Sequence, residues 1–390
     1  MGELREAQRT EGVLVQTHIG GQALLEGVMM RGRYNWAVAV RQPDGSIYTE
    51  QHDLASGKDR ASWMRIPVIR GCVAFVESLA LGYKALGIAA DHAFDLSEEG
   101  GPAAADESGD AGSEGVGQGM MVLSFLLGLV FAIVVFIVAP AALTNLIMGD
   151  YTAHTPAWNL VDGCIRVALF ILYVWGISFM EDIRRMFAYH GAEHKTIHCY
   201  EHGRELTPEN AQGYPRLHVR CGTAFLVMTL IVAIIVFSVV PVGPLIDQLG
   251  VTNPVARLVL VMVSRLVLLP LVAGVSYEVT VKWAGSRPDD PLVKVVLWPG
   301  MQMQRLTTRQ PDEDMLECAI VAMQLVIERE VQEAQVRGIH AEGLLPSDDG
   351  KEPVVASPAA KHPCGHACRS VRRAFGPGTV HVRRDFLEVP

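Results

Sequence analysis

The residues best suited to chemistry gather in one short stretch. Residues 189–202 read YHGAEHKTIHCYEH and hold four of the 13 histidines, each four residues from the next. Residues four apart lie on nearly the same face of an α-helix. His190, Glu193 and His194 have the spacing His-x-x-Glu-His, in which two histidines one turn apart hold a metal ion and the glutamate activates water. His190 and His194 are therefore predicted metal ligands, and Glu193 is the predicted catalytic base.

A third ligand must come from elsewhere in the chain, because a catalytic zinc ion takes three protein ligands and leaves one position for water. Glu278 is the first choice, since a downstream glutamate completes the inverted motif in known hydrolases. Cys221 and His218 come next. His198 could serve on the helix face, in support of the ligands, or at a second metal ion. Arg220, beside Cys221, is a further candidate for a substrate contact.

The alternative for this stretch is a polar interfacial helix that binds no metal, because so short a motif also occurs by chance. The expected return of His218, Cys221 and Glu278 to the same membrane face favours the metal site. Zinc suits these ligands best, although manganese or iron would also suit a set of His and Glu. A tail cluster at residues 362–368, HPCGHAC, is a weaker candidate because its ligands are more closely spaced than in usual structural zinc sites.

Four apolar stretches must position these residues. Residues 119–148, 160–179, 222–246 and 254–277 each approach the roughly 20 residues that cross a bilayer as a helix. The chain of 390 residues is 50% hydrophobic and only 19% charged, with a mean hydropathy of +0.24. These values exclude a simple soluble globule and predict an α-helical polytopic membrane protein with about four transmembrane helices.

Basic residues predict the orientation of these spans, since short cytoplasmic connections are rich in Lys and Arg. Residues 149–159 and 247–253 contain neither. The connection 181–221 contains six, namely Arg184, Arg185, Lys195, Arg204, Arg216 and Arg220. That connection is expected in the cytoplasm, with both termini, in a multi-pass protein of the cytoplasmic membrane. No removable signal peptide is visible.

One arginine lies deep within a predicted span. A charge at such a depth is costly and usually pairs inside the bundle. Arg265 is therefore expected to pair with Asp162 or with backbone carbonyls, and a direct role at a site is the alternative.

The remaining segments suggest five units. Residues 13–94 form a small α+β cytoplasmic or interfacial unit, with a hairpin in AVAVRQPDGSIYTE and an interfacial or bundle-packed helix at 66–94, for which a re-entrant element is the alternative. Residues 95–118 form an acidic linker, and 119–280 form the membrane domain with its His-rich helix 181–202. Residues 281–336 hold loops and a C-terminal amphipathic helix, and 337–390 form a loose tail.

Charge and cysteine content narrow the classes of partner. The formal net charge is −9 and no basic run resembles a nucleic-acid arm, so no nucleic-acid partner is expected. Seven scattered cysteines do not suggest a disulfide framework. The lipid bilayer is the expected environment, and self-association is left open.

Six motifs in order resemble the YqhQ-like family of bacterial membrane proteins. They are GGQALLEGVMMRG, IPVIRGCVAFVESLALGYKAL, YHGAEHKTIHCYE, HVRCGTAFL, GVSYE and PGMQMQRLTTRQPDEDMLECAI, and they span about residues 14–330. Val219 stands where the family commonly has proline, which affects no proposed ligand. The family is of unknown function and is described as a group of predicted metal-dependent enzymes, so the resemblance implies a metal at His190 and His194 but no substrate.

Glu26 lies in the first of these motifs, GGQALLEGVMM. Two interpretations are equally supported. Glu26 is either a further carboxylate for metal or substrate, or a buried partner of Arg31 or Arg70.

Three functions fit these features. The first is a membrane-bound metal-dependent hydrolase at the cytoplasmic face, acting on a membrane-protein segment, a lipid head group or a small metabolite. The second is a non-enzymatic membrane factor, in which the metal cross-links helices and the N-terminal unit recruits a protein partner. The third is a transporter using Arg265 and the histidines, which ranks last because four spans are few and carry no acidic pair at mid-depth.

Overall fold

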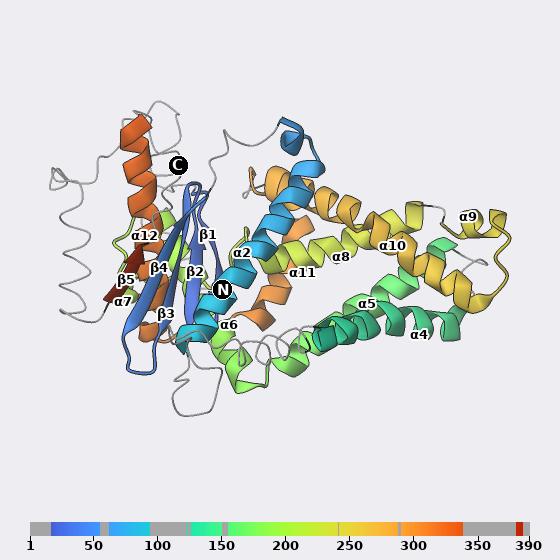
Figure 1. Ribbon diagram of the computed structural model, residues 1–390, viewed down its shortest axis with the longest axis horizontal. Helices are drawn as coiled ribbons and strands as arrows, with labels where there is room; N and C mark the ends of the chain where they lie inside the picture. The colour runs from blue at the N-terminus through green and yellow to red at the C-terminus, as the bar shows by residue number, and fades with distance from the viewer. Residues whose placement is uncertain are drawn as a thin grey trace, which may run out of the picture.

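The computed structural model combines a sheet-and-helix unit with an elongated helical bundle (Figure 1). It describes residues 17–54, 62–93, 123, 126–149, 155–240, 242–287, 290–337 and 380–384. The acidic linker and the HPCGHAC cluster lie outside the described residues.

The sheet has five strands in the order β1-β2-β3-β4-β5. The strands are β1 (Gly20–Leu24), β2 (Gly27–Arg31), β3 (Asn35–Arg41), β4 (Ile47–Asp53) and β5 (Val380–Arg384). The first four pair antiparallel, and the predicted hairpin corresponds to β3 and β4. Residues 380–384, which composition assigned to a loose tail, pair with β4 in parallel.

Helices cover both faces of the sheet, because alternate strand residues point to opposite faces and both sets are apolar. On one face, side chains such as Val28 and Ala39 pack with α6 (Glu181–Glu201) and α12 (Glu313–Arg337). On the other, Trp36 and Val38 pack with Ala85 and Ala89 of α2 (Ile69–Ala93). The sheet core is therefore closed by helices from three distant parts of the chain.

The bundle contains the apolar helices. The membrane-length segments are Leu126–Met148, which ends in α4 (Ala139–Met148), α5 (Thr155–Ile177), α8 (Gly222–Val239), and α10 (Pro254–Tyr277) continuing into the π-helical η4 (Glu278–Ala284). Shorter elements are η2 (Ser62–Arg65), a π-helical turn η3 (Val134–Val138), α7 (Pro208–Gln212), α9 (Val242–Gln248) and α11 (Pro291–Thr307). With α2, five helices of the described chain are long and apolar enough to cross a membrane.

Helix α2 joins the two parts of the molecule. Near its start, Gly71 approaches Gly274 and Tyr277 at the end of α10, so closely that a Cβ at Gly71 would lie 2.7 Å from the Tyr277 side chain. Its second half packs on the sheet through Ala85 and Ala89. In Figure 1 α2 crosses the end of the bundle beside the sheet.

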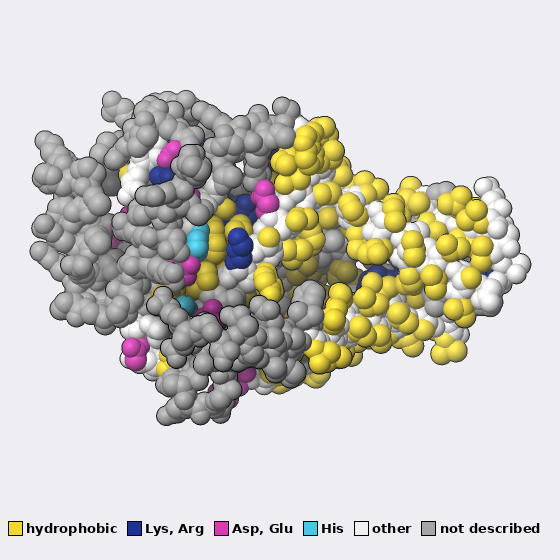
Figure 2. Space-filling model, viewed as in Figure 1, with side chains coloured by type: hydrophobic (Ala, Val, Ile, Leu, Met, Phe, Trp, Pro, Cys, Tyr) yellow, Lys and Arg dark blue, Asp and Glu magenta, His cyan; other side chains and the backbone are white. Residues whose placement is uncertain are grey.

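Exposed apolar side chains cover the bundle, as Figure 2 shows at the end away from the sheet. Leu146, Val239, Val255, Leu266 and Val267 are each more than 60% exposed. Such extensive exposed apolar surface indicates that the bundle contacts another apolar phase. The surface fits a bundle surrounded by lipid.

Arg265 is paired inside the bundle, and its expected pairing with Asp162 is confirmed. Its guanidinium donates to Asp162 Oδ2 at 3.0 Å and to Asn159 Oδ1 at 3.2 Å. Arg166 also donates to Asp162 Oδ2, at 2.9 Å. The network joins α5 to α10 within the bundle, which gives Arg265 a structural role.

Replacing Asp162 with alanine should destabilise the bundle, because the buried Arg265 charge would lose its carboxylate. Removing one partner of a buried ion pair typically costs about 3–5 kcal/mol. We expect a lower midpoint of thermal unfolding in detergent for Asp162→Ala and substantial recovery in Asp162→Ala/Arg265→Met. An unchanged midpoint in the single variant would contradict this role.

Candidate metal centre

Helix α6 is polar, yet from Ala188 to its end it is largely buried. Glu181 and Asp182 in its first turn complement the positive end of the helix dipole. Farther along, Glu193 and His194 are only 4% and 1% exposed. Burying polar groups without partners is costly, so each such group needs a hydrogen bond or a ligand.

A single loop supplies many of these partners. Lys195 Nζ donates to the carbonyls of Gln212 and Tyr214, both at 2.7 Å. His198 Nε2 bonds the Leu217 carbonyl at 2.9 Å. Burial lowers the pKa of Lys195 to about 8. Since this loop leads directly to Cys221 at the start of α8, these bonds also position that cysteine.

His190 and His194 are oriented by backbone carbonyls. His190 Nδ1 lies 2.9 Å from the Thr307 carbonyl, and His194 Nδ1 lies 2.6 Å from the Arg216 carbonyl. A carbonyl can only accept, so in both rings Nδ1 carries a proton and Nε2 is the nitrogen that remains to face a ligand. This arrangement is typical of metal-binding histidines.

The Nε2 atoms of both rings converge on Cys221. His190 Nε2 lies 3.1 Å from Cys221 Sγ, and ligand atoms of His190, His194 and Cys221 all lie within 4.8 Å of one another. His194 Nε2 is buried without a hydrogen-bond partner among the described residues. Ligands of a tetrahedral zinc ion lie roughly 3.5 Å apart. Two imidazoles and a thiolate at these separations fit a zinc ion.

Charge distribution at the cluster favours a thiolate. Burial alone would raise the pKa of Cys221, but His190 and His194 hold it well below its usual range. Burial alone would lower the pKa of His190, but the Cys221 thiolate raises it to about 9. The thiolate is the form of cysteine that binds metal, and a metal ion bound here would displace the His190 proton that the thiolate now stabilises.

Glu193 lies beside this cluster, and only one of its two carboxylate oxygens has a hydrogen-bond partner among the described residues. The Gly21 backbone N–H donates to it, whereas Oε2 is buried without a partner among the described residues. Burial raises the pKa of Glu193, and His194 and His190 oppose the shift. A carboxylate with a raised pKa is a better proton acceptor near neutral pH.

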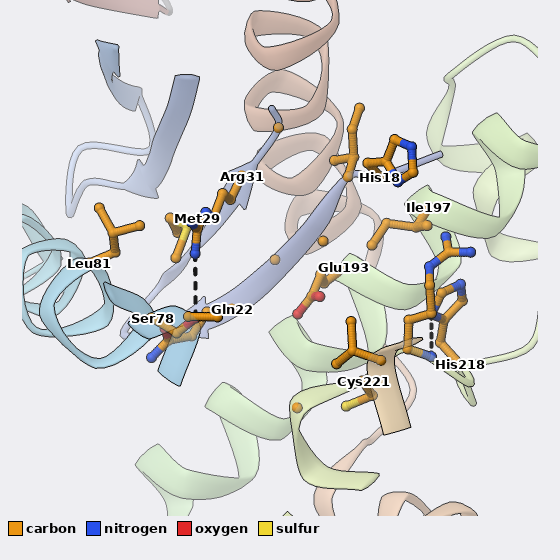
Figure 3. A pocket seen from close by; sticks show the side chains of 18 of the residues that line it. His18, Gln22, Met29, Arg31, Ser78, Leu81, Glu193, Ile197, His218 and Cys221 are labelled. Carbon is orange, nitrogen blue, oxygen red and sulfur yellow. Dashed lines mark hydrogen bonds between the residues drawn. The ribbon is translucent and has the colours of Figure 1, made fainter. Parts of the chain in front are cut away.

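A cavity of about 410 Å³ is lined by Glu193, His194 and Cys221. Figure 3 shows Glu193 and Cys221 on one side, with Gln22 and Arg31 of the sheet across from them. The wall beyond Arg31 is α2, through residues such as Ser78 and Leu81. The cavity thus lies where the sheet, α6, α2 and the start of α8 meet.

The structure does not bring Glu278 to the histidines, contrary to expectation. Its carboxylate forms an ion pair with Arg70 and accepts from the Val68 backbone N–H at 3.3 Å. Arg70 and Val68 lie at the start of α2, which packs against α10. Cys221, which was named with His218 as the next choice, lies beside His190 and His194 instead.

Glu26 also has a partner that neither interpretation named. It accepts two hydrogen bonds from Arg185, at 2.6 and 2.5 Å, and one from the Tyr189 hydroxyl at 3.3 Å. It pairs with neither Arg31 nor Arg70 in the described structure. The residue has a positive φ of 50° in the β1–β2 turn. Glu26 therefore ties that turn to α6.

His198, His218 and Glu201 form a second group of potential ligands, within 4.8 Å of one another. Here the lone pairs are already used. Glu201 accepts from Arg220 and lies 3.4 Å from His218 Nε2, whose ring accepts from the Arg220 backbone N–H at Nδ1. Burial would raise the pKa of Glu201, but these two partners lower it to about 2. The group is a satisfied hydrogen-bond network that supports the loop before Cys221.

Sequence reasoning missed Gln304, which is fully buried. It accepts from the His218 backbone N–H at 2.9 Å and donates to the His218 carbonyl at 2.8 Å. Thr307, on the same helix, supplies the carbonyl that orients His190. A glutamine within the largely apolar run PLVKVVLWPGMQMQ was the available signal.

Comparisons with known proteins agree with the motif pattern. Residues 66–329 match the family described as "Protein of unknown function (DUF1385)". The chain is also 33% identical over 307 residues to "Uncharacterized protein YqhQ" of Bacillus subtilis (strain 168), which covers 77% of this chain and 89% of that protein. No solved structure matches. The chain belongs to this YqhQ-like family.

Metal content should distinguish Cys221 from Glu278 as the third ligand. We expect full-length protein in detergent to hold about one zinc ion, which Cys221→Ala and His190→Ala/His194→Ala lose. Glu278→Gln should retain it, since Glu278 pairs with Arg70. Elemental analysis beside a thermal unfolding curve gives the test, and zinc lost in Glu278→Gln but kept in Cys221→Ala would refute this ligand set.

Proposed function

We propose that this member of the YqhQ-like family is a membrane-bound, metal-dependent hydrolase. The observation that carries the proposal is a pair of buried atoms, His194 Nε2 and Glu193 Oε2, that have no hydrogen-bond partner among the described residues and lie beside His190 and Cys221. Glu193, His194 and Cys221 line one cavity. Unsatisfied buried polar atoms are costly and mark places where a ligand completes the bonding. A divalent cation, with zinc the best fit, would satisfy the nitrogen.

Each residue of the site would have a separate role in hydrolysis. His190, His194 and Cys221 hold the metal, which supplies a Lewis acid that polarises the bond to be cleaved. Glu193 accepts a proton from the attacking water and passes it to the leaving group. Gly21 orients Glu193 through its backbone N–H. The cavity walls supplied by the sheet and α2 limit access of bulk water.

A second candidate function keeps the metal but assigns it a structural role. The three ligands come from α6 and the N-cap of α8, so a metal would cross-link the sheet unit to the bundle. Such a protein would act by recruiting a partner rather than by catalysis. The unpartnered Glu193 oxygen favours the hydrolase, because a structural zinc site gives no role to a buried carboxylate beside its ligands.

We place the cavity on the cytoplasmic side of the cytoplasmic membrane. The connections at the far end of the bundle, residues 149–159 and 247–253, hold no Lys or Arg, whereas residues 181–221 hold six. In Figure 1, α9 lies at the far end and α6 at the sheet end. Basic residues favour the cytoplasmic side.

Fusions should reveal this orientation. Alkaline phosphatase inserted after Gly250 is expected to be active, because that connection would face the exterior. Green fluorescent protein attached after Arg337 is expected to fluoresce in the cytoplasm. The reverse pattern would place the cavity outside the cell.

Replacing Glu193 with glutamine should separate catalysis from metal binding. The isosteric amide cannot take a proton, so hydrolysis should fall by about 10²–10⁴-fold while zinc content stays unchanged. The assay incubates zinc-loaded protein in H₂¹⁸O with β-casein, phospholipid vesicles and p-nitrophenyl esters, and mass spectrometry follows ¹⁸O in the products. Glu278→Gln is the matched control and should keep its rate.

Two results would count against the hydrolase. One is an unchanged rate in Glu193→Gln at equal zinc content. The other is a wild-type protein that hydrolyses nothing and unfolds when zinc is removed, which would support the structural role.

A further inference from the structure

Strand β1 is an open edge of the sheet. Its only strand partner within the described chain is β2, whereas the opposite side of β4 is occupied by β5. An unpaired edge presents backbone N–H and C=O groups that can pair with another extended chain. The residues that lie opposite the β1 edge therefore bear on the function of the protein.

The register identifies the backbone groups that point outward. β1 and β2 are joined by a two-residue loop, so the closing pair Leu24 and Gly27 is hydrogen-bonded. Hydrogen-bonded and non-hydrogen-bonded pairs alternate along antiparallel strands. Gly20 and Gln22 thus bond to β2, and Gly21 and Ala23 face the open edge. The donation from the Gly21 N–H to Glu193 agrees with this assignment.

The open edge runs along the cavity that holds the metal ligands. Five consecutive residues, 18–22, line it, together with Glu193, His194 and Cys221. A Cβ added at Gly21 would lie 2.9 Å from Glu193 Cδ, and Figure 3 shows Glu193 and Cys221 across the cavity from Gln22. A chain lying against β1 would therefore pass directly over the proposed catalytic group.

Gly20 has no structural requirement for glycine. A Cβ added there would meet no atom within 4 Å, and its φ is not positive. Gly21, by contrast, has no room for a Cβ, which would lie 2.7 Å from the Met29 carbonyl. Glycine in a strand often marks close approach of another backbone or a ligand. The approach of a second chain would explain the open space at Gly20.

The two arginines that line the cavity are already paired with carboxylates, which argues against an anionic head group as its occupant. Arg31 forms an ion pair with Glu77 at 3.2 Å. Arg220 forms an ion pair with Glu201. The backbone edge of β1 is therefore the main recognition feature that the cavity offers.

We propose that the cavity binds an extended polypeptide segment, which pairs with the β1 edge as an added strand and presents a peptide bond to Glu193 and the metal ligands. The inference rests on the proposed hydrolase function and makes the enzyme a peptidase. Water adds to the carbonyl carbon and the C–N bond breaks. Glu193 carries one proton from the water to the departing amine, so the products are a carboxylic acid and an amine, with no oxidant or reductant.

Hydroxamates provide the test, because the hydroxamate group binds zinc whether or not a peptide is attached. Calorimetry on full-length, zinc-loaded protein in detergent compares acetohydroxamate with acetylated tetraalanine hydroxamate. We expect the peptide to bind at least about tenfold tighter, since two or more edge hydrogen bonds contribute on the order of 1 kcal/mol each. Methylating the peptide nitrogens that face β1 should remove this gain, and methylating the alternate nitrogens should not.

Two variants test whether the added affinity of the peptide hydroxamate depends on the cavity beside β1. Gly20→Ile adds bulk at a cavity-lining position where a Cβ meets no atom within 4 Å, and it should abolish the gain from the peptide while leaving acetohydroxamate affinity unchanged. Gly87→Ile is the matched control, because Gly87 is equally open but lies on α2 away from the cavity lining. It should behave as wild type.

Other outcomes separate this inference from the function on which it rests. Equal binding of both hydroxamates to wild type, or displacement by phosphatidylglycerol vesicles but not by peptides, would overturn peptide recognition and leave the hydrolase standing. No zinc and no binding of either hydroxamate would overturn the hydrolase itself and this inference with it.

Discussion

The burial of a polar helix is the constraint on which the rest of the structure depends. α6 carries Glu193, His194 and Lys195 into the interior, where each polar group needs a partner. The loop between α7 and α8 meets this need with its carbonyls, which accept from Lys195, His194 and His198. These bonds connect the sheet unit to the bundle and fix the loop that ends at Cys221.

The contrast between the two histidine groups follows from the same requirement. His218 and Glu201 contact each other, and Arg220 donates a hydrogen bond to each of them. Their potential ligand atoms therefore already have partners. Around His194, the Nδ1 proton is satisfied but Nε2 is not. The two histidine groups therefore contain similar residues but differ in their hydrogen bonding. Among the described residues, only the group at His194 has a buried ligand nitrogen without a hydrogen-bond partner that could bind a cation.

Much of this arrangement could be predicted from the sequence because it depends on local patterns. Apolar length identified the bundle, and four-residue spacing placed His190 and His194 on one helix face. The Asp162–Arg265 pair could be predicted because few partners for a charge exist within the apolar spans.

Contacts between distant segments could not be predicted in the same way. The sequence made Glu278 a reasonable ligand, but in the structure Glu278 pairs with Arg70 at the start of α2. Sequence spacing does not predict how α2 packs against α10. Glu26 was expected to meet Arg31 or Arg70, but the turn that holds it faces Arg185 of α6. The open edge of β1 likewise depends on the order of strands, which periodicity alone does not reveal.

X-ray absorption spectroscopy of zinc-loaded protein tests the central claim most directly, because it identifies ligand atoms without requiring a substrate. A site formed by His190, His194 and Cys221 predicts one sulfur at about 2.3 Å and two nitrogens at about 2.0–2.1 Å. The sulfur contribution should disappear in Cys221→Ala. A shell of nitrogen and oxygen alone in the wild-type protein would contradict the proposed centre.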